Sequence, residues 1–286
     1  MTETMQRWSM NALGRESLQL VQVPVPQPGP GEIRVRVSAV ALNYRDKMVI
    51  EGTMPIPLSF PFTPASDMAG VVDSIGEGVT RFKPGARVIS TFFPEWIDGK
   101  PQADARNLPY KTSGGYFQGM LAEYVIVSEN ALVASPESLD DAEASTLPCA
   151  GLTAWFALVE RGHLRAGQSV LVQGTGGVSL FALQIAKAHG AEVIVTSGSD
   201  EKLALAKKLG ASQGINRLKG DWAENTLALT QDRGIDHIIE SVGGVILRHS
   251  LRAVAVHGRS SVIGVLAGTD ISLPAGELLL KSPVIQ

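Results

Sequence analysis

The chain has 286 residues, of which 44% are hydrophobic and 19% charged, and its formal net charge at pH 7 is −3. This length exceeds that of a typical single domain and predicts two domains, each large enough to bury a core. The composition is that of a globular protein and excludes a disordered one. Lys and Arg residues are scattered singly, which argues against nucleic acid as a partner.

Export, membrane insertion and disulfide bonding find no support in the sequence. The segment Met1–Trp8 lacks an apolar run of signal-peptide length, and no later run approaches roughly 18 uninterrupted apolar residues. We therefore expect a cytoplasmic protein without a membrane partner. The single cysteine, Cys149, excludes a disulfide framework and any zinc site that requires two or more thiolates.

Residues 1–130 consist of predicted strands separated by Pro- and Gly-containing turns. The segment 93–115 is polar and patternless, which predicts a surface excursion. The whole segment predicts a domain built as an irregular β-barrel. Its strands are expected at 18–23, 33–37, 69–75, 87–90 and 121–127.

Residues 131–286 alternate apolar runs of strand length with stretches of helical period, a pattern typical of βαβ units. This predicts a doubly wound parallel sheet and an α/β fold class. No flexible linker separates the two halves, so we expect them to be joined tightly. The expected strands are 169–173, 192–196, 235–241 and 260–265, and the expected helices are 177–189, 200–209, 221–230 and 245–254.

A glycine turn, Gly174-Thr175-Gly176-Gly177-Val178-Ser179, follows one of these strands and opens a helix. Glycine allows the tight turn and lets backbone N–H groups and the helix N-terminus approach a pyrophosphate. Ser179 stands where Gly or Ala is usual, which is a mild departure. The turn predicts a dinucleotide site. The alternative is a tight turn in a sheet that binds something else.

The end of the next strand predicts which dinucleotide is bound. NAD sites usually place Asp or Glu there, whereas this chain reads Thr196-Ser197-Gly198-Ser199. Ser197, Ser199, Lys202 and Arg217 offer hydroxyl donors and positive charge for a 2′-phosphate. The sequence therefore favours NADP(H), although Lys202 and Arg217 also fit ordinary solvated charges and acidic residues follow at 200 and 201.

Motifs in both halves resemble the medium-chain dehydrogenase/reductase superfamily, in its zinc-independent quinone-oxidoreductase-like branch. This resemblance implies a GroES-like substrate domain at 1–130, a Rossmann domain at 131–286, catalysis in the cleft between them, and a homodimer. The motifs are Pro28-Gly29-Pro30-Gly31-Glu32, Leu42-Asn43-Tyr44-Arg45-Asp46, Pro64-Ala65-Ser66-Asp67-Met68-Ala69-Gly70, Pro84-Gly85-Ala86-Arg87-Val88, Leu147-Pro148-Cys149-Ala150-Gly151-Leu152-Thr153-Ala154-Trp155, and the glycine turn with Thr196-Ser197-Gly198-Ser199.

The resemblance also bears on metal binding. Zinc-containing members draw ligands from the positions of Asn43, Ser66 and Cys149, and here only the cysteine is present. Asn and Ser are poor zinc ligands, and 93–115 lacks the cysteines of a structural zinc site, so we expect no metal. The five histidines show no ligand spacing and are expected at the surface or at helix ends.

Without a metal, an already activated substrate is favoured: a quinone or an α,β-unsaturated carbonyl that receives hydride. The resemblance implies catalytic roles for Asn43, Tyr44 and Asp46, with Tyr44 or water as the proton source. Asp46 and Asp67 would orient these groups, and Thr153 would lie beside the cofactor. The alternatives are that Asn43 is a turn residue, Tyr44 a packed aromatic and Asp46 a helix cap.

Two further functions stay open: an alcohol or aldehyde dehydrogenase of the same superfamily, and a non-catalytic NADPH-binding protein. At the C-terminal end, the apolar run after Pro283 resembles the start of a strand. We therefore expect the chain to be the truncated part of a longer protein.

Overall fold

The computed structural model describes residues 3–54, 56–100, 104, 106 and 111–286. Its contacts divide the chain into two units, Met1–Cys149 and Ala150–Gln286. The sequence placed this boundary after residue 130. The later position has a physical reason: strand β7 (Leu132–Ala134) pairs antiparallel with β5 (Arg87–Ser90), and Leu132 is fully buried in the core of the first unit.

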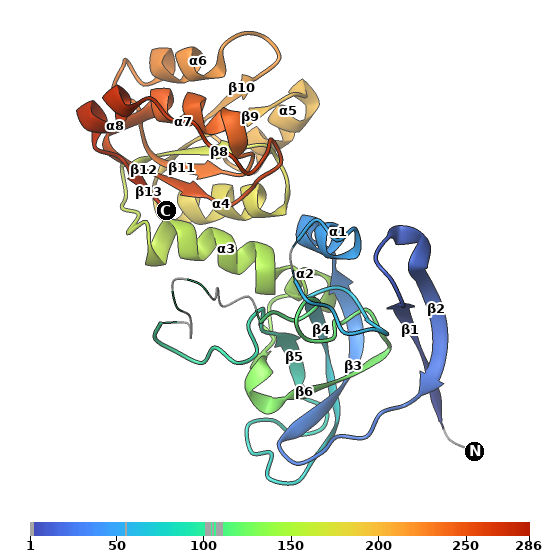
Figure 1. Cartoon of the computed structure of the whole chain (residues 1–286). Coiled ribbons are helices and arrows are strands. Elements are labelled where there is room, and N and C mark those ends of the chain that lie inside the picture. The colour runs from blue at the N-terminus through green and yellow to red at the C-terminus, as the bar shows by residue number, and fades with distance from the viewer. Residues whose placement is uncertain (1–2, 55, 101–103, 105, 107–110) are drawn as a thin grey trace. The chain divides into compact units, whose positions relative to one another are not determined.

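The first unit is antiparallel, as expected for a GroES-like domain (Figure 1). Its five-stranded sheet has the order β6-β3-β4-β5-β7, and a two-stranded ribbon of β1 and β2 accompanies it. Ile33 and Val35 of β3 are fully buried, which is the period-2 pattern of a half-buried strand. The remaining strands are β1 (Thr4–Met10), β2 (Leu18–Pro24), β3 (Glu32–Ala41), β4 (Asp67–Ile75) and β6 (Tyr124–Ser128).

Two short α-helices belong to this unit. Helix α1 (Tyr44–Ile50) follows β3 after a two-residue connection and buries Val49 against Met10 and Phe62. Helix α2 (Asp141–Ala144) is capped by Asp140, whose side chain accepts a hydrogen bond from the backbone N–H of Glu143. Single 3-10 turns lie at Arg15–Ser17 and Glu129–Ala131.

The second unit is a parallel sheet with the order β10-β9-β8-β11-β12-β13, which confirms the expected doubly wound fold. The order reverses direction between β8 and β11, and dinucleotides bind at such a switch point.

The strands are β8 (Ser169–Gln173), β9 (Glu192–Ser197), β10 (Gln213–Asn216), β11 (Ile235–Glu240), β12 (Val254–Val262) and β13 (Val284–Ile285). The α-helices are α3 (Leu152–Trp155), α4 (Gly177–Ala188), α5 (Asp200–Lys208), α6 (Trp222–Leu229), α7 (Leu247–Ala253) and α8 (Ala275–Lys281). Two π-helical turns, Leu147–Gly151 and Phe156–Glu160, flank α3, and a 3-10 turn at Gly244–Ile246 precedes α7.

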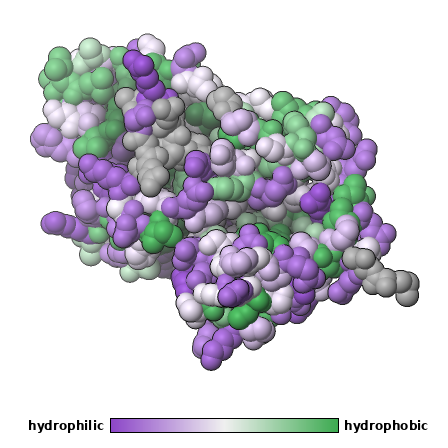
Figure 2. Space-filling view, turned by 60° about the horizontal axis from the view of Figure 1, so that its bottom comes forward, coloured by the Kyte–Doolittle hydropathy of each residue, from purple (hydrophilic) through white to green (hydrophobic). Residues whose placement is uncertain are grey.

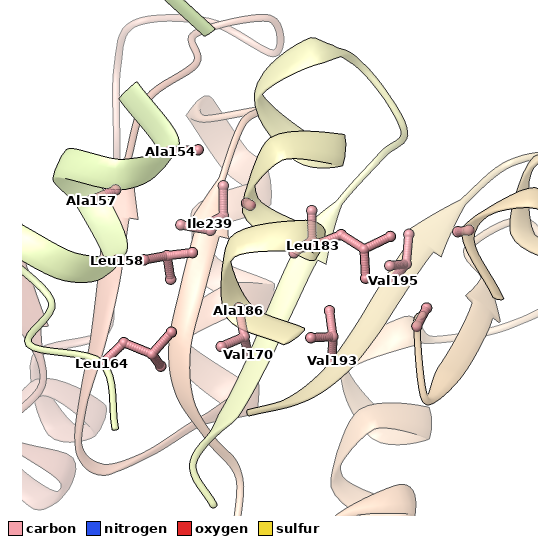
Figure 3. Packing of buried hydrophobic residues seen from close by; sticks show 14 of the residues in the cluster. Ala154, Ala157, Leu158, Leu164, Val170, Leu183, Ala186, Val193, Val195 and Ile239 are labelled. Atoms are coloured by element: carbon pink, nitrogen blue, oxygen red, sulfur yellow. The ribbon is translucent and has the colours of Figure 1, made fainter. Parts of the chain in front are cut away.

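Hydrophobic residues cover both faces of this sheet, as a parallel sheet requires. Val170 of β8 packs in one cluster with Leu158 of the π-helical turn after α3 and with Leu183 of α4 (Figure 3). Leu171, the next residue of β8, points to the opposite face and packs with Ile238 and Leu251. The glycine turn therefore follows a strand that is held from both sides.

Several predicted elements are displaced or missed. The sequence placed a helix at 245–254 and a strand at 260–265, whereas β12 begins at Val254 directly after α7. His257 interrupts β12 with a φ of +59°, and the register against β11 shifts there, so no alternating pattern marks its start. The strands β1 and β10 and the helix α8 were not predicted. The C-terminal apolar run does form a short strand, β13.

Two burial predictions need correction. In the predicted surface excursion 93–115, residues 95–100, 104, 106 and 111 are exposed as expected, whereas Thr112, Ser113 and the two glycines after them are buried; residues 101–103, 105 and 107–110 lie outside the described residues. His237 was predicted to be exposed or at a helix end, but it is 5% exposed within β11, where its Nε2 lies 3.1 Å from Oε1 of Gln168.

The described surface mixes polar and apolar residues. The face drawn in Figure 2 carries hydrophobic residues in several separate groups among hydrophilic ones. Within the described ranges, no helix combines the length and apolarity that crossing a bilayer requires.

One lysine joins two helices of the second unit. Lys281, the last residue of α8, donates from Nζ to the backbone carbonyls of Leu251, Arg252 and Val254, at 2.8, 2.6 and 3.0 Å. These carbonyls lie at the C-terminal end of α7, where helix carbonyls have no intrahelical partner. Burial lowers the pKa of Lys281, and these hydrogen bonds satisfy its ammonium group.

Candidate functional site

The glycine turn has the geometry of an anion-binding loop. Gly174 adopts a φ of +76°, which side chains rarely tolerate, and its N–H donates to the carbonyl of Thr196 in the neighbouring strand β9 at 2.8 Å. Gly176 is exposed, and no atom lies within 4 Å of the position that a Cβ there would occupy. The start of α4 therefore presents open space in front of backbone N–H groups that have no intrahelical acceptor.

Ser179 replaces the usual third small residue without disturbing the turn. Its side chain is 5% exposed, and Oγ donates a 2.8 Å hydrogen bond to the carbonyl of Gln173, the last residue of β8. A hydroxyl here satisfies a buried acceptor between strand and helix. The departure from the usual glycine pattern is thus compatible with close packing of α4 on the sheet.

The end of β9 carries the residues expected around a 2′-phosphate. Ser197 is 5% exposed, and Ser199 caps α5 by accepting the N–H of Lys202 at 3.3 Å. Arg217 Nη2 lies 3.5 Å from the position that a Cβ at Gly198 would occupy. The side chains of Lys202 and Arg217 are exposed, and neither makes an ion pair or a hydrogen bond with the described residues. Two cations near this strand end therefore remain uncommitted.

The nearest acidic residue of α5 is already paired. Asp200 accepts hydrogen bonds from Lys219 Nζ at 2.7 Å and from Asn216 Nδ2 at 2.8 Å. These two donors lower the pKa of the Asp200 carboxyl group. The carboxylate is thus neutralised by a lysine on the neighbouring loop.

Thr153 lies half-buried on α3, which packs against α4. The first residue of α4 faces the start of this helix, since a Cβ at Gly177 would lie 3.4 Å from Cβ of Ala150. The structure therefore places α3 beside the glycine turn of its own unit, as a contact of Thr153 with the cofactor would require. Val178 is half-buried in the first turn of α4.

The predicted catalytic residues gather at the start of α1. Asn43 is the N-cap residue, and its backbone N–H donates to Oδ2 of Asp46 at 2.8 Å, as in a capping box. Asp46 is 3% exposed, and Nη1 of Arg45 lies 3.6 Å from its Oδ1. Burial raises the pKa of Asp46 to about 6, while the Asn43 N–H and Arg45 oppose the shift.

A second buried carboxyl group belongs to the same cluster. Asp67 is fully buried; it accepts hydrogen bonds from Ser66 Oγ at 2.5 Å and from the N–H of Cys149 at 2.9 Å. Burial raises its pKa, and the hydrogen bonds from Ser66 and Cys149, together with the nearby Asn43 amide, oppose this. Its negative charge in turn contributes to the raised pKa of Asp46. The two aspartates therefore interact electrostatically.

The three predicted catalytic residues differ in exposure. Tyr44 is 56% exposed, with the Lys47 ammonium 5.4 Å from its ring centroid, so it is not a packed aromatic. Asn43 Nδ2 is buried, and its amide faces Asp67. Asp46 is a helix-capping residue, as one alternative held. Of the three residues, only Tyr44 is exposed.

The side chains near Asn43 show whether a metal ion could be held there. Among the described residues, no three His, Cys, Asp or Glu side chains lie close enough together to hold a metal ion. Near Asn43 the available groups are a hydroxyl on Ser66, the thiol of Cys149 and two carboxyl groups that the cluster already hydrogen-bonds. This set does not fit a tetrahedral zinc site.

Arg45, Gln173 and Glu240 were not identified from the sequence as site residues. Arg45 donates from Nη1 to the carbonyls of Ser113 and Gly114, at 3.3 and 3.2 Å, and thereby fixes the buried turn opposite α1. Glu240 directly follows the apolar residues Ile238 and Ile239 at the end of a buried strand. A charged residue at such a position needs partners, and this sequence signal could have identified Glu240.

Comparison with known families covers both units. A family described as "Alcohol dehydrogenase GroES-like domain" matches residues 29–137, and one described as "Zinc-binding dehydrogenase" matches residues 177–286. Fold and site together define a two-domain oxidoreductase that uses a nicotinamide cofactor. The chain belongs to the medium-chain dehydrogenase/reductase superfamily.

Individual relatives carry two kinds of name. A "Zinc-type alcohol dehydrogenase-like protein" of Schizosaccharomyces pombe is 42% identical over 87% of this chain and 73% of its own length. The "Quinone oxidoreductase" of Rattus norvegicus is 33% identical over 82% of this chain. This match spans 64% of the rat protein, so the chain covers less than two thirds of that relative.

Solved structures similar to this chain also carry these two kinds of name, alcohol dehydrogenase and quinone oxidoreductase. A putative alcohol dehydrogenase from Sinorhizobium meliloti 1021 has a TM-score of 0.96 and 61% identity, covering all of this chain and 84% of that one. An Escherichia coli quinone oxidoreductase, solved in complex with NADPH, has a TM-score of 0.81 and 26% identity over 98% of this chain and 80% of its own.

Proposed function

We propose that this protein is an NADPH-dependent reductase that transfers hydride to a quinone or an α,β-unsaturated carbonyl compound without a catalytic metal. The observation that carries the proposal is a pair of uncommitted cations, Lys202 and Arg217, near an open glycine turn, at a strand end where Asp200 is paired with Lys219.

The glycine turn fits a pyrophosphate, since the space in front of Gly176 is open and the N-terminus of α4 favours an anion. Arg217 and Lys202 would meet the 2′-phosphate, and Ser197 and Ser199 would add hydroxyl groups near it. Asp200 would not repel that phosphate strongly, because Lys219 neutralises it.

Metal independence is proposed from the donor set around Asn43 and Ser66. Neither residue type is a good zinc ligand, and Asp67 is occupied by hydrogen bonds from Ser66 and Cys149. Without a Lewis acid, the substrate must itself be electrophilic, which favours quinones and enones over simple alcohols.

The bound cofactor would supply hydride to the substrate. The exposed Tyr44 hydroxyl would donate a hydrogen bond or a proton to the developing oxyanion. Asp46 would hold Tyr44 in place by capping α1, and Asn43 would be fixed between Asp46 and Asp67. Thr153 would support the cofactor from α3.

The test is a turnover panel of quinones, enones, aldehydes and alcohols with NADPH and with NADH, each with and without a chelator, alongside metal analysis of the purified protein. We expect turnover of quinones or enones with NADPH, no effect of the chelator, and well under one zinc per chain. Stoichiometric zinc whose removal abolishes turnover would overturn metal independence, and a clear preference for NADH would overturn the cofactor assignment.

A second candidate is an alcohol or aldehyde dehydrogenase of the same superfamily. It is favoured by the names of the two relatives at 42% and 61% identity. Oxidation of simple alcohols by metal-free protein, at rates exceeding those of quinone reduction, would select this candidate.

We also propose that the protein is a homodimer located in the cytoplasm. The dimer is proposed from the superfamily to which the chain belongs, as the sequence resemblance implies. Light scattering should give twice the mass of the chain; a concentration-independent monomer would contradict the dimer.

A further inference from the structure

A buried carboxyl group in the second unit connects two turns that follow the carboxyl ends of β8 and β11, at 174–177 and 242–244. Glu240 is fully buried at the end of β11. Its Oε1 accepts hydrogen bonds from the backbone N–H groups of Val242 and Gly243, at 3.0 and 2.9 Å. Its Oε2 accepts from Gln173 Nε2 at 2.7 Å and from Ser250 Oγ. Burying a carboxylate is costly unless donors surround it, and here four do.

The partner of Glu240 stands directly before the glycine turn. Gln173 ends β8, and its carbonyl accepts two hydroxyl groups, Ser179 Oγ at 2.8 Å and Ser241 Oγ at 2.9 Å. Hydrogen bonds thus run in both directions between β8 and β11, from Gln173 to Glu240 and from Ser241 back to Gln173. They cross the point where the strand order reverses.

The turn that Glu240 holds is packed too closely to adjust independently. Gly243 and Gly244 have φ values of +68° and +53°. A Cβ on Gly243 would lie 2.2 Å from the carbonyl oxygen of Gly264, and a Cβ on Gly264 would lie 1.8 Å from that of Ser241. Backbone contacts therefore tie the turn at 242–244 to the loop after β12, and side-chain hydrogen bonds tie it to β8.

We propose that Glu240 and Gln173 are positioning residues that hold the turn at 242–244 in register with the glycine turn at 174–177. In a doubly wound sheet, the dinucleotide crosses the switch point, with its adenosine half over the first three strands. In this protein Lys202 and Arg217 lie on the side of the sheet where the adenosine half would bind. The turn after β11 then faces the nicotinamide half, and Glu240 fixes the distance between the two halves of the site.

This proposal needs only a nicotinamide dinucleotide, which family membership supports, and not the preference for NADPH. Two probes test it: whichever of NADPH and NADH binds wild type more tightly, and the matching fragment without nicotinamide, 2′-phospho-ADP-ribose or ADP-ribose. A merely structural defect would weaken binding of both probes. A positioning defect weakens binding of the complete dinucleotide alone.

The decisive variants are Gln173→Glu and the double exchange Gln173→Glu/Glu240→Gln. The single variant sets two carboxyl groups against each other. The exchange restores one amide facing one carboxylate, with Ser250 between them and an oxygen at 240 to accept the N–H groups of 242 and 243. We expect the dissociation constant of the dinucleotide to rise about tenfold or more in Gln173→Glu and to return to within about threefold of wild type in the exchange. That of the fragment should stay within about threefold throughout.

Ser241→Ala provides a milder test should Gln173→Glu fail to fold. It removes one hydrogen bond to the Gln173 carbonyl, which keeps the hydrogen bond from Ser179. The dissociation constant of the dinucleotide should rise about two- to fivefold, with that of the fragment unchanged. The proposal is overturned if the exchange binds the dinucleotide no better than Gln173→Glu, or if both probes lose affinity in parallel. A wild type that prefers NADH would contradict only the proposed function.

Discussion

The backbone N–H of Asn43 donates a 2.8 Å hydrogen bond to the side chain of Asp46, so a buried carboxyl group begins helix α1. The same group lies within electrostatic reach of a second buried carboxyl group, on Asp67. Local helix capping and the titration of the predicted catalytic cluster therefore depend on one side chain.

Asp46→Asn should stabilise the protein increasingly as the pH rises. The pKa of Asp46 is raised from 3.8 to about 6, so the folded state binds this proton more tightly than the unfolded state does. Wild-type stability should therefore fall between about pH 4 and pH 6 and change no further above it, by up to about 3 kcal/mol. An asparagine keeps an oxygen for the Asn43 N–H and carries no titrating group. Urea unfolding of both proteins between pH 4 and pH 8 measures the difference. A difference that is constant with pH would contradict the assignment.

Gly176→Ala should weaken cofactor binding while leaving the free protein as stable as wild type. A Cβ at this position meets no atom within 4 Å and thus fills the space in front of the backbone N–H groups. We expect the dissociation constant of NADPH to rise at least tenfold. Gly174→Ala is the matched comparison, because its φ of +76° strains a side chain and should cost about 1 kcal/mol or more of stability. Fluorescence titration and thermal unfolding measure the two effects; tight binding by Gly176→Ala would contradict the site.

Arg217→Ala should weaken NADPH binding by roughly ten- to hundredfold and leave NADH binding unchanged, since it removes a charge-assisted contact with the 2′-phosphate. Lys208→Ala, at the far end of α5, removes an equal charge away from the strand end and should alter neither affinity. Isothermal titration with both cofactors distinguishes the cases. An equal loss for NADPH and NADH would mean that Arg217 does not contact the 2′-phosphate.

Tyr44→Phe should lower kcat at least tenfold without lowering stability, because the ring is 56% exposed and only the hydroxyl group is lost. Steady-state rates with the best substrate from the turnover panel, together with the thermal midpoint, test this. Tyr124→Phe, on β6, is the control and should match wild type in both. Unchanged kcat in Tyr44→Phe would leave water as the proton source.

Much of the second unit could be predicted from the sequence, because parallel strands buried on both faces appear as continuous apolar runs such as Val170–Val172. The first unit was harder. Helix α1 spans only seven residues; Asp46 caps its start and Val49 is buried, and neither feature produces a helical period. The contacts divide the chain after Cys149 and not after residue 130, and the sequence does not show this because β7 is three residues long and its partner β5 is distant in sequence.

The candidate sites show the same contrast. The glycine turn was visible because its backbone demands glycine at fixed positions. The pairing of Asp200 with Lys219 and the contacts of Arg45 with Ser113 and Gly114 join residues that no local pattern connects. Burial of Asp46 and Asp67, which raises the pKa values of both, likewise depends on tertiary packing.

Lys281 has a consequence for how the second unit opens. Because its ammonium group supplies donors to the last carbonyls of α7, the end of that helix depends on α8 remaining docked. The two helices should behave as one cooperative unit in hydrogen exchange, so that amides in the last turn of α7 and in α8 lose protection together.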